Sequence, residues 1–131
     1  MERKSINPWS WPVKLGFDQA QLISGHRRLL ICSGQDSVDA DGNAQHPGDM
    51  GAQVELALDN LQALLSAADM TFANIVRLNA YTTDVDQLLR NFGRVSKRFG
   101  GADARFTTSL LGVTRLPLPQ LLVMLEATAA D

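Results

Sequence analysis

The chain has 131 residues, which is the length of one ordinary domain. With 45% hydrophobic and 20% charged residues, it has the composition of a folded protein and not of a disordered one. A net charge of -2 gives no general attraction for nucleic acid or for anionic membranes, so we expect neither as a partner. The single cysteine, Cys32, cannot form an internal disulfide, and no stretch approaches the ~20 apolar residues of a membrane span. We therefore expect a cytoplasmic protein.

The first half of the chain contains two predicted strands and a loop. Apolar runs over 17–23 and 29–33 flank the polar gap Ser24-Gly25-His26-Arg27, which is the pattern of a hairpin. Residues 34–48 are rich in Asp, Gly, Asn and Pro, and they predict a surface loop.

Two amphipathic helices are predicted, over 50–68 and over 85–99. In both segments the apolar residues recur at three- and four-residue spacing. Asp49 is placed to cap the first helix, and Gly100-Gly101 is placed to end the second. Each helix is expected to bury one face.

The remaining strands are predicted over 75–81, 106–114 and 121–129. The first of them alternates apolar and polar positions, and the last two are separated by 115–119, where two prolines forbid a continuous ladder. The element order β-β-α-β-α-β-β predicts an α+β fold, with two helices on one face of a mixed sheet.

Residues 1–131 are expected to form a single domain, with 1–16 as an N-terminal arm. Trp9 and Trp11 in this arm either pack at a subunit interface or cover a ligand cleft. The stretch 121–125 is apolar on both alternating sides, which predicts that the protein forms oligomers through its sheet.

Several short motifs, taken together, resemble the Rid family, also called YjgF-like proteins. The resemblance runs from Phe17 to Ala129 and rests on Ser33-Gly34-Gln35, Ala57-Leu58-Asp59-Asn60-Leu61, Thr82-Thr83-Asp84, Arg115-Leu116-Pro117 and Leu125-Glu126-Ala127. It implies a chorismate-mutase-like fold and a homotrimer whose sheets line a central barrel. It also implies that small ligands bind in clefts between the subunits.

The resemblance further implies hydrolysis of reactive imines and enamines, in which an arginine holds the substrate carboxylate and a glutamate positions water. Glu126 falls on the family glutamate. Thr108 stands at the position of the arginine, and Phe17 stands where the family often has tyrosine. Arg105 lies three residues before the arginine position. The chain therefore resembles a divergent member without the usual carboxylate clamp.

The candidate site residues each have a structural alternative. Apolar neighbours on its strand face are expected to raise the proton affinity of Glu126, unless this carboxylate is simply paired. Thr108 and Ser109 offer hydroxyl groups to a ligand, or are ordinary strand residues. Arg115 supplies positive charge at a subunit boundary, or pairs with a surface carboxylate.

The sequence lacks the sets of residues that a thiol enzyme, a calcium loop or another metal site would need. Cys32 has no activating base nearby in the sequence and is expected to be a buried core residue. The run Asp39 to Asn43 lacks the glycine and glutamate spacing of a calcium loop, and His46 with Asp49 are too few for a metal site. We expect no metal and no cofactor. The leading hypothesis is an imine or enamine deaminase or related C–N hydrolase, and the alternative is a noncatalytic protein that binds a small metabolite.

Overall fold

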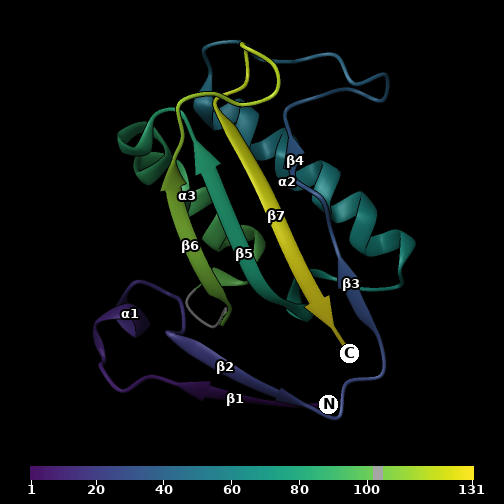
Figure 1. The fold of residues 1–131 in the computed structure, drawn as a ribbon, viewed down its shortest axis with the longest axis vertical. Coiled ribbons are helices and arrows are strands. Elements are labelled where there is room, and N and C mark those ends of the chain that lie inside the picture. Colours follow the sequence, from purple (N-terminus) through teal and green to yellow (C-terminus); the bar gives the residue numbers. More distant parts are fainter. Residues whose placement is uncertain (102–104) are drawn as a thin grey trace.

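A computed structural model describes residues 1–101 and 105–131 of the chain. Its main feature is a five-stranded mixed sheet in the order β3-β7-β5-β6, with β4 also paired to β7 (Figure 1). Strands β5 and β6 run parallel, whereas β3, β4 and β5 are each antiparallel to β7. The bounds of these strands are β3 Leu29–Ile31, β4 Gln35–Asp36, β5 Ile75–Thr82, β6 Thr107–Gly112 and β7 Val123–Ala130.

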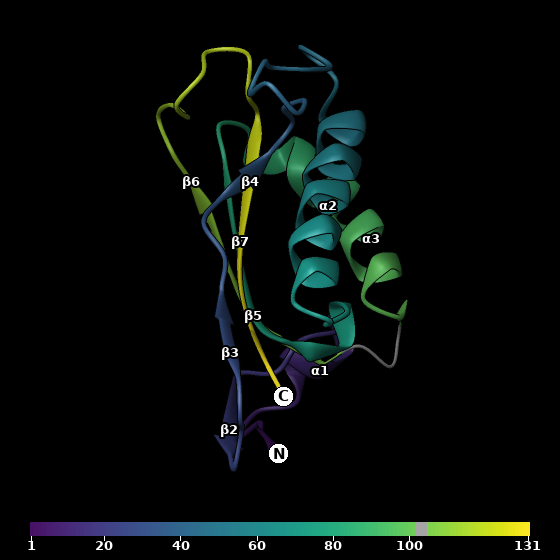
Figure 2. The same ribbon diagram turned by 90° about the vertical axis from the view of Figure 1, so that its right-hand side faces the viewer.

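Helices α2 (Met50–Ala67) and α3 (Val85–Arg98) cover one face of this sheet, and the other face is open (Figure 2). The Asp49 carboxylate caps α2 by accepting a hydrogen bond from the backbone N–H of Ala52 at 3.0 Å. Asp84 caps α3 in the same way. The predicted α+β arrangement, with two helices on one face of a mixed sheet, is confirmed.

The core lies between the helices and the sheet. Strand β7 alternates strictly: Val123, Leu125, Ala127 and Ala129 are buried toward the helices, while the residues between them are only partly buried. On β5, Leu78 and Ala80 are buried in the same layer. The alternation determines which side chains of β5, β6 and β7 reach the open face.

The predicted hairpin between 17–23 and 29–33 is wrong in its pairing. Strand β2 (Ala20–Ser24) pairs with β1 (Glu2–Ile6) in a separate two-stranded sheet, whereas β3 pairs with β7. The chain does turn at Gly25, whose φ of 68° suits glycine, but the strand that follows joins the main sheet. Residues 1–16, which were expected to be an arm, therefore contain β1 and the short helix α1 (Trp11–Lys14). A one-turn 3-10 helix, η1 (Phe72–Asn74), leads into β5.

Candidate functional site

The register of the sheet divides the candidate residues between its two faces. Asn79 of β5 lies opposite Ser109 of β6 on one side and opposite Glu126 of β7 on the other, so these three side chains share one face. Thr108 lies opposite Leu78, whose side chain is buried in the core, and therefore belongs to the helix-covered face. Glu126 and Thr108 of one subunit thus point away from each other across the sheet.

On the open face, two neighbours on β5 hold the carboxylate of Glu126. The side-chain amide of Asn79 donates to Oε1 at 3.0 Å, and the hydroxyl of Tyr81 donates to the same oxygen at 2.5 Å. Arg77 donates from Nε to Oδ1 of Asn79 at 3.3 Å and so fixes the orientation of that amide. The four side chains form a chain of contacts across β5 and β7.

These hydrogen bonds determine the charge of Glu126. Bonds from Asn79 and Tyr81 stabilise the carboxylate and, outweighing the effect of burial, lower the pKa of Glu126 below its usual value. The bond to Glu126 in turn raises the pKa of Tyr81. The expected increase in the proton affinity of Glu126 is therefore wrong, because polar donors and not apolar side chains surround it. Glu126 is ionised at neutral pH.

A cavity of about 390 Å³ lies on the other side of the sheet, between α3, β6 and the segment after α1. It brings together two predicted residues, Phe17 and Thr108, that are far apart in sequence. The Thr108 hydroxyl oxygen is buried and has no hydrogen-bond partner among the residues that the structure describes. The ring of Trp11 packs edge-on against Phe17 with the ring centroids 5.8 Å apart, so Trp11 supports the cavity wall. The cavity is lined by Leu15, Phe17, Leu89, Phe92, Gly93, Ser96, Thr108 and Leu110.

The other candidate residues lie outside this cavity. Ser109 lines a separate cavity of about 290 Å³ together with Gln21, Arg77 and Thr108, next to β2. Arg115 is exposed in the connection between β6 and β7, and it lines neither of these two cavities.

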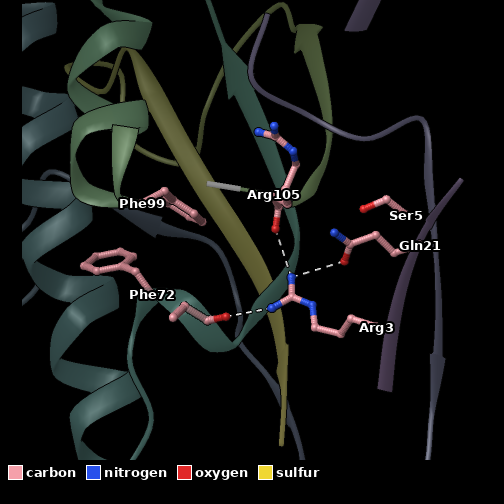
Figure 3. A pocket seen from close by; sticks show the side chains of 7 residues that line it. Arg3, Ser5, Gln21, Phe72, Phe99 and Arg105 are labelled. Carbon is pink, nitrogen blue, oxygen red and sulfur yellow. Dashed lines mark hydrogen bonds between the residues drawn. The ribbon is translucent and has the colours of Figure 1, made fainter. Parts of the chain in front are cut away.

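Arg105 lines a third cavity, beside the two-stranded sheet of β1 and β2, which we call the N-terminal hairpin (Figure 3). The guanidinium of Arg3 is the centre of this region. It donates to the backbone carbonyls of Ala73 at 2.7 Å, Ile75 at 2.8 Å and Arg105 at 2.9 Å. It also donates to Oε1 of Gln21 at 3.2 Å. Because its donors are directed at protein oxygens, Arg3 ties β1 to the main sheet and is not placed as a clamp for a substrate anion.

Buried Asp18 belongs to the same hairpin. Its carboxylate accepts hydrogen bonds from Ser5 at 2.6 Å and from Asn7 and Gln21 at 2.8 Å each. Burial alone would raise the pKa of Asp18, but these hydrogen bonds and the positive charge of Arg105 outweigh it and lower the pKa. The charge of Arg105 therefore acts on the hairpin, and Arg105 is not among the residues that line the cavity of Thr108.

The structure also describes the cysteine and the possible metal ligands. Cys32 is buried, and burial raises the pKa of its thiol, which is the opposite of what a nucleophile needs. Within 1–101 and 105–131, His, Cys, Asp and Glu side chains form no group of three or more that could hold a metal ion. None of the helices in this part of the chain is long and apolar enough to span a membrane.

Comparison with known families separates this chain from other mixed α+β proteins. Residues 16–131 match the family model described as Endoribonuclease L-PSP. The chain belongs to this family, the Rid or YjgF-like proteins. Its fold is accordingly the chorismate-mutase-like fold that the sequence motifs implied.

Several Rid-family relatives are similar to this chain. Protein DfrA of Myxococcus xanthus is 32% identical over 76% of this chain and 73% of its own length. The 2-iminobutanoate/2-iminopropanoate deaminase of Rattus norvegicus is 30% identical over 72% of this chain and 65% of the rat protein. Among solved structures, the Rid-family protein YyfB of Yersinia pestis, whose function is unknown, is 34% identical with a TM-score of 0.85, and each chain is fully covered.

Sequence reasoning missed the hydrogen-bond partners of Glu126 on the open face of the sheet and part of the cavity lining on the helix-covered face. Asn79 and Tyr81 alternate along the predicted strand 75–81, which could have placed them on one face with Glu126. Of the four cavity residues of α3, the apolar pattern places Leu89 and Phe92 on the buried face of the helix, but it gives no signal for Gly93 and Ser96.

Proposed function

We propose that this Rid-family protein is a homotrimer that hydrolyses a small imine, enamine or related C–N bond at a cleft between subunits. Glu126 of one subunit and Thr108 with Phe17 of its neighbour form the site. The observation that carries the proposal is the division of Glu126 and Thr108 between opposite faces of one sheet. A single subunit cannot present both to one ligand, whereas two copies can. The similarity to an iminopropanoate deaminase supports the reaction type.

The open face of the sheet supports assembly. It carries Leu29, Ile31 and Leu111, whose residues are 52%, 74% and 47% exposed in the isolated chain. Large aliphatic side chains on a sheet face gain stability when a partner covers them, at ~25 cal/mol per Å² of apolar surface removed from water. A trimer whose sheets line a central barrel would cover these residues.

The chemistry assigned to Glu126 follows from its ionised state. Both hydrogen bonds from β5 end on Oε1, which leaves Oε2 to accept a hydrogen bond from a water molecule. The water oxygen bonds to the imine carbon, and one water proton passes through Glu126 to the nitrogen. The C–N bond then breaks as the second proton moves to nitrogen, which gives a carbonyl compound and ammonia. No metal or cofactor is required, and the cytoplasm is the proposed location.

Measurement of ammonia release tests this function. Enamines are generated in situ from several amino acids, and wild-type protein is compared with Glu126→Gln. We expect Glu126→Gln to lower the rate about 100-fold or more, since the carboxylate is the proton acceptor. An unchanged rate would remove Glu126 from the mechanism.

Mixed trimers test the division of the site. Glu126→Gln and Thr108→Phe are each expected to be inactive as homotrimers. When equal amounts of the two are dissociated and reassembled together, about a quarter of the clefts receive intact Glu126 from one subunit and intact Thr108 from the next. Recovery of about a quarter of wild-type activity supports the shared cleft. Complete lack of recovery from properly assembled mixed trimers contradicts it.

A noncatalytic protein that binds a small metabolite is the second candidate. It is favoured by the presence of Thr108, which has one hydroxyl group and no charge, at the position implied for the arginine. Wild-type protein that binds small ligands but releases no ammonia from any substrate would establish this alternative.

A further inference from the structure

The cavity beside α3 is chemically distinct from a site for an anion. None of the eight described residues that line it has a charged side chain. Leu89, Phe92, Gly93 and Ser96 follow the three- and four-residue spacing of one helix stripe, and they face Thr108 and Leu110 of β6. An ionised carboxylate in this cavity would lose its water without gaining a cation, which is strongly unfavourable.

Two hydroxyl side chains line the cavity: Ser96, which donates to the backbone carbonyl of Phe92 at 3.5 Å, and Thr108. The hydroxyl oxygen of Thr108 is buried and unpaired within the described chain, although buried hydroxyl groups normally have a partner. A hydroxyl group both donates and accepts, so it can bond to an amide, carbonyl or alcohol. An uncharged ligand of this kind would satisfy the hydroxyl group without bringing a charge into the cavity.

Gly93 keeps the cavity open. It lies inside α3, where glycine costs helix stability relative to alanine, and its φ is not positive. A Cβ at this position would meet nothing within 4 Å. Neither backbone geometry nor close packing within the described chain requires glycine here, and the absence of a side chain leaves open space at this wall of the cavity, which a larger residue would fill.

We propose that the cavity between α3 and β6 binds the apolar body of a small uncharged molecule, which hydrogen-bonds to Thr108. Its volume of about 390 Å³ suits a branched aliphatic or single aromatic group. The inference rests on the proposed function in one respect, because it takes this molecule to be the substrate at the site of Thr108. It then assigns the substrate to a neutral, largely apolar class.

Binding of matched probes tests this proposal without any hydrolysis. Phenylacetamide and isovaleramide are compared with phenylacetate and isovalerate by titration of the backbone amide resonances of isotope-labelled protein. We expect the amides to shift resonances of α3 from Leu89 to Ser96 and of β6 around Thr108. The acids should bind at least about tenfold more weakly, since none of the described lining residues is a cation. Equal or tighter binding of the acids at these residues would overturn the neutral class.

Substitutions then locate the ligand. Gly93→Leu should fill the cavity and weaken amide binding at least about tenfold, while Gly93→Ala adds only a methyl group and should retain binding. If Gly93→Leu does not fold, Ser96→Leu fills the same space from one turn further along α3. Thr108→Val should weaken amide binding, and Thr108→Ser should restore it. Amide binding that is indifferent to both filling variants would place the ligand elsewhere and contradict the proposal.

The two proposals fail in different ways. Amide binding at α3 without ammonia release from any substrate would exclude the hydrolase and keep the neutral pocket. Ammonia release with no probe response at α3 would exclude the pocket and keep the hydrolase.

Discussion

The side chain of Thr108 is unusual for a folded protein, because its polar group is buried without a hydrogen-bond partner in the described part of the chain. Its hydroxyl group is removed from water and, within the described residues, receives no hydrogen bond in return. Such a group lowers stability, because the hydrogen bonds that it makes to water in the unfolded chain are lost on folding. Binding and stability therefore make opposite demands on this residue.

The first prediction concerns the stability of a Thr108 variant. Thr108→Val keeps the shape of the side chain and removes the unpaired hydroxyl group, so the free energy of unfolding should rise by about 1 kcal/mol. Urea denaturation at fixed protein concentration measures the change, with Thr108→Ser as the control that retains the hydroxyl group. A loss of stability on Thr108→Val would show that the hydroxyl group has a partner in solution.

The second prediction concerns the pKa of Glu126. Tyr81→Phe removes one of the two hydrogen bonds that favour the carboxylate form, so the pKa of Glu126 should rise toward its ordinary value. The acid limb of the pH profile for ammonia release should move to higher pH by the same amount. Carbon NMR of the Glu126 carboxyl group measures the pKa directly.

The control for this variant is amide binding at α3. Tyr81 is not among the residues that line that cavity, and Glu126 still carries its charge at neutral pH in this variant, so Tyr81→Phe should leave the affinity for phenylacetamide at pH 7 unchanged. A pKa of Glu126 that does not move would mean that Asn79 alone holds the carboxylate.

Among the structural elements, the β1–β2 hairpin depends on one ionised side chain. The carboxylate of Asp18 links Ser5 and Asn7 on one side of the hairpin to Gln21 on the other. Its lowered folded-state pKa makes this link sensitive to acid.

The third prediction gives the sign of that sensitivity. The pKa of Asp18 is lower in the folded than in the unfolded chain, so its stabilising contribution is complete above the unfolded value of about 3.9. The contribution is lost as the pH falls through the folded value. Protection of β1 amides from hydrogen exchange should therefore decrease below about pH 4. Asp18→Asn should remove this step, whereas Asp41→Asn in the exposed loop should leave it.

The elements differ in how far sequence could predict them. Helix α2 could be predicted because its cap, Asp49, and its apolar spacing are local signals. Strand β1 could not, because Glu2–Ile6 is largely polar and is a strand only through its pairing with β2. The partner of β3 likewise depends on β7, which lies about 100 residues further along the chain.

The candidate site shows the same division. The resemblance directed attention to Phe17 and Thr108, and the structure places both on one cavity. Tyr81 and Asn79 reach Glu126 only because β5 and β7 pair in one particular register, and a shift of one residue would send these side chains to the other face.

At the scale of the whole molecule, the open sheet face gives the fourth prediction. Ile31→Glu places a charge on the most exposed aliphatic residue of that face, so it should dissociate the proposed trimer. Sedimentation velocity measures the oligomeric state. Leu22→Glu, at an exposed residue of the separate sheet of β1 and β2, is the matched control and should leave the oligomeric state unchanged. A wild-type monomer at all concentrations would remove the basis for a cleft between subunits.

The contacts of Arg3 have a consequence for the order of folding. Two of its acceptors, the carbonyls of Ala73 and Arg105, lie 70 and 102 residues later in the sequence. During synthesis the first strand emerges well before these acceptors exist, and contacts between such distant residues form slowly. The β1–β2 hairpin can form early by itself, but it can dock only after β6 has been made. We therefore expect the segment of β1 and β2, although it is synthesised before the main sheet, to be the last to reach its native place.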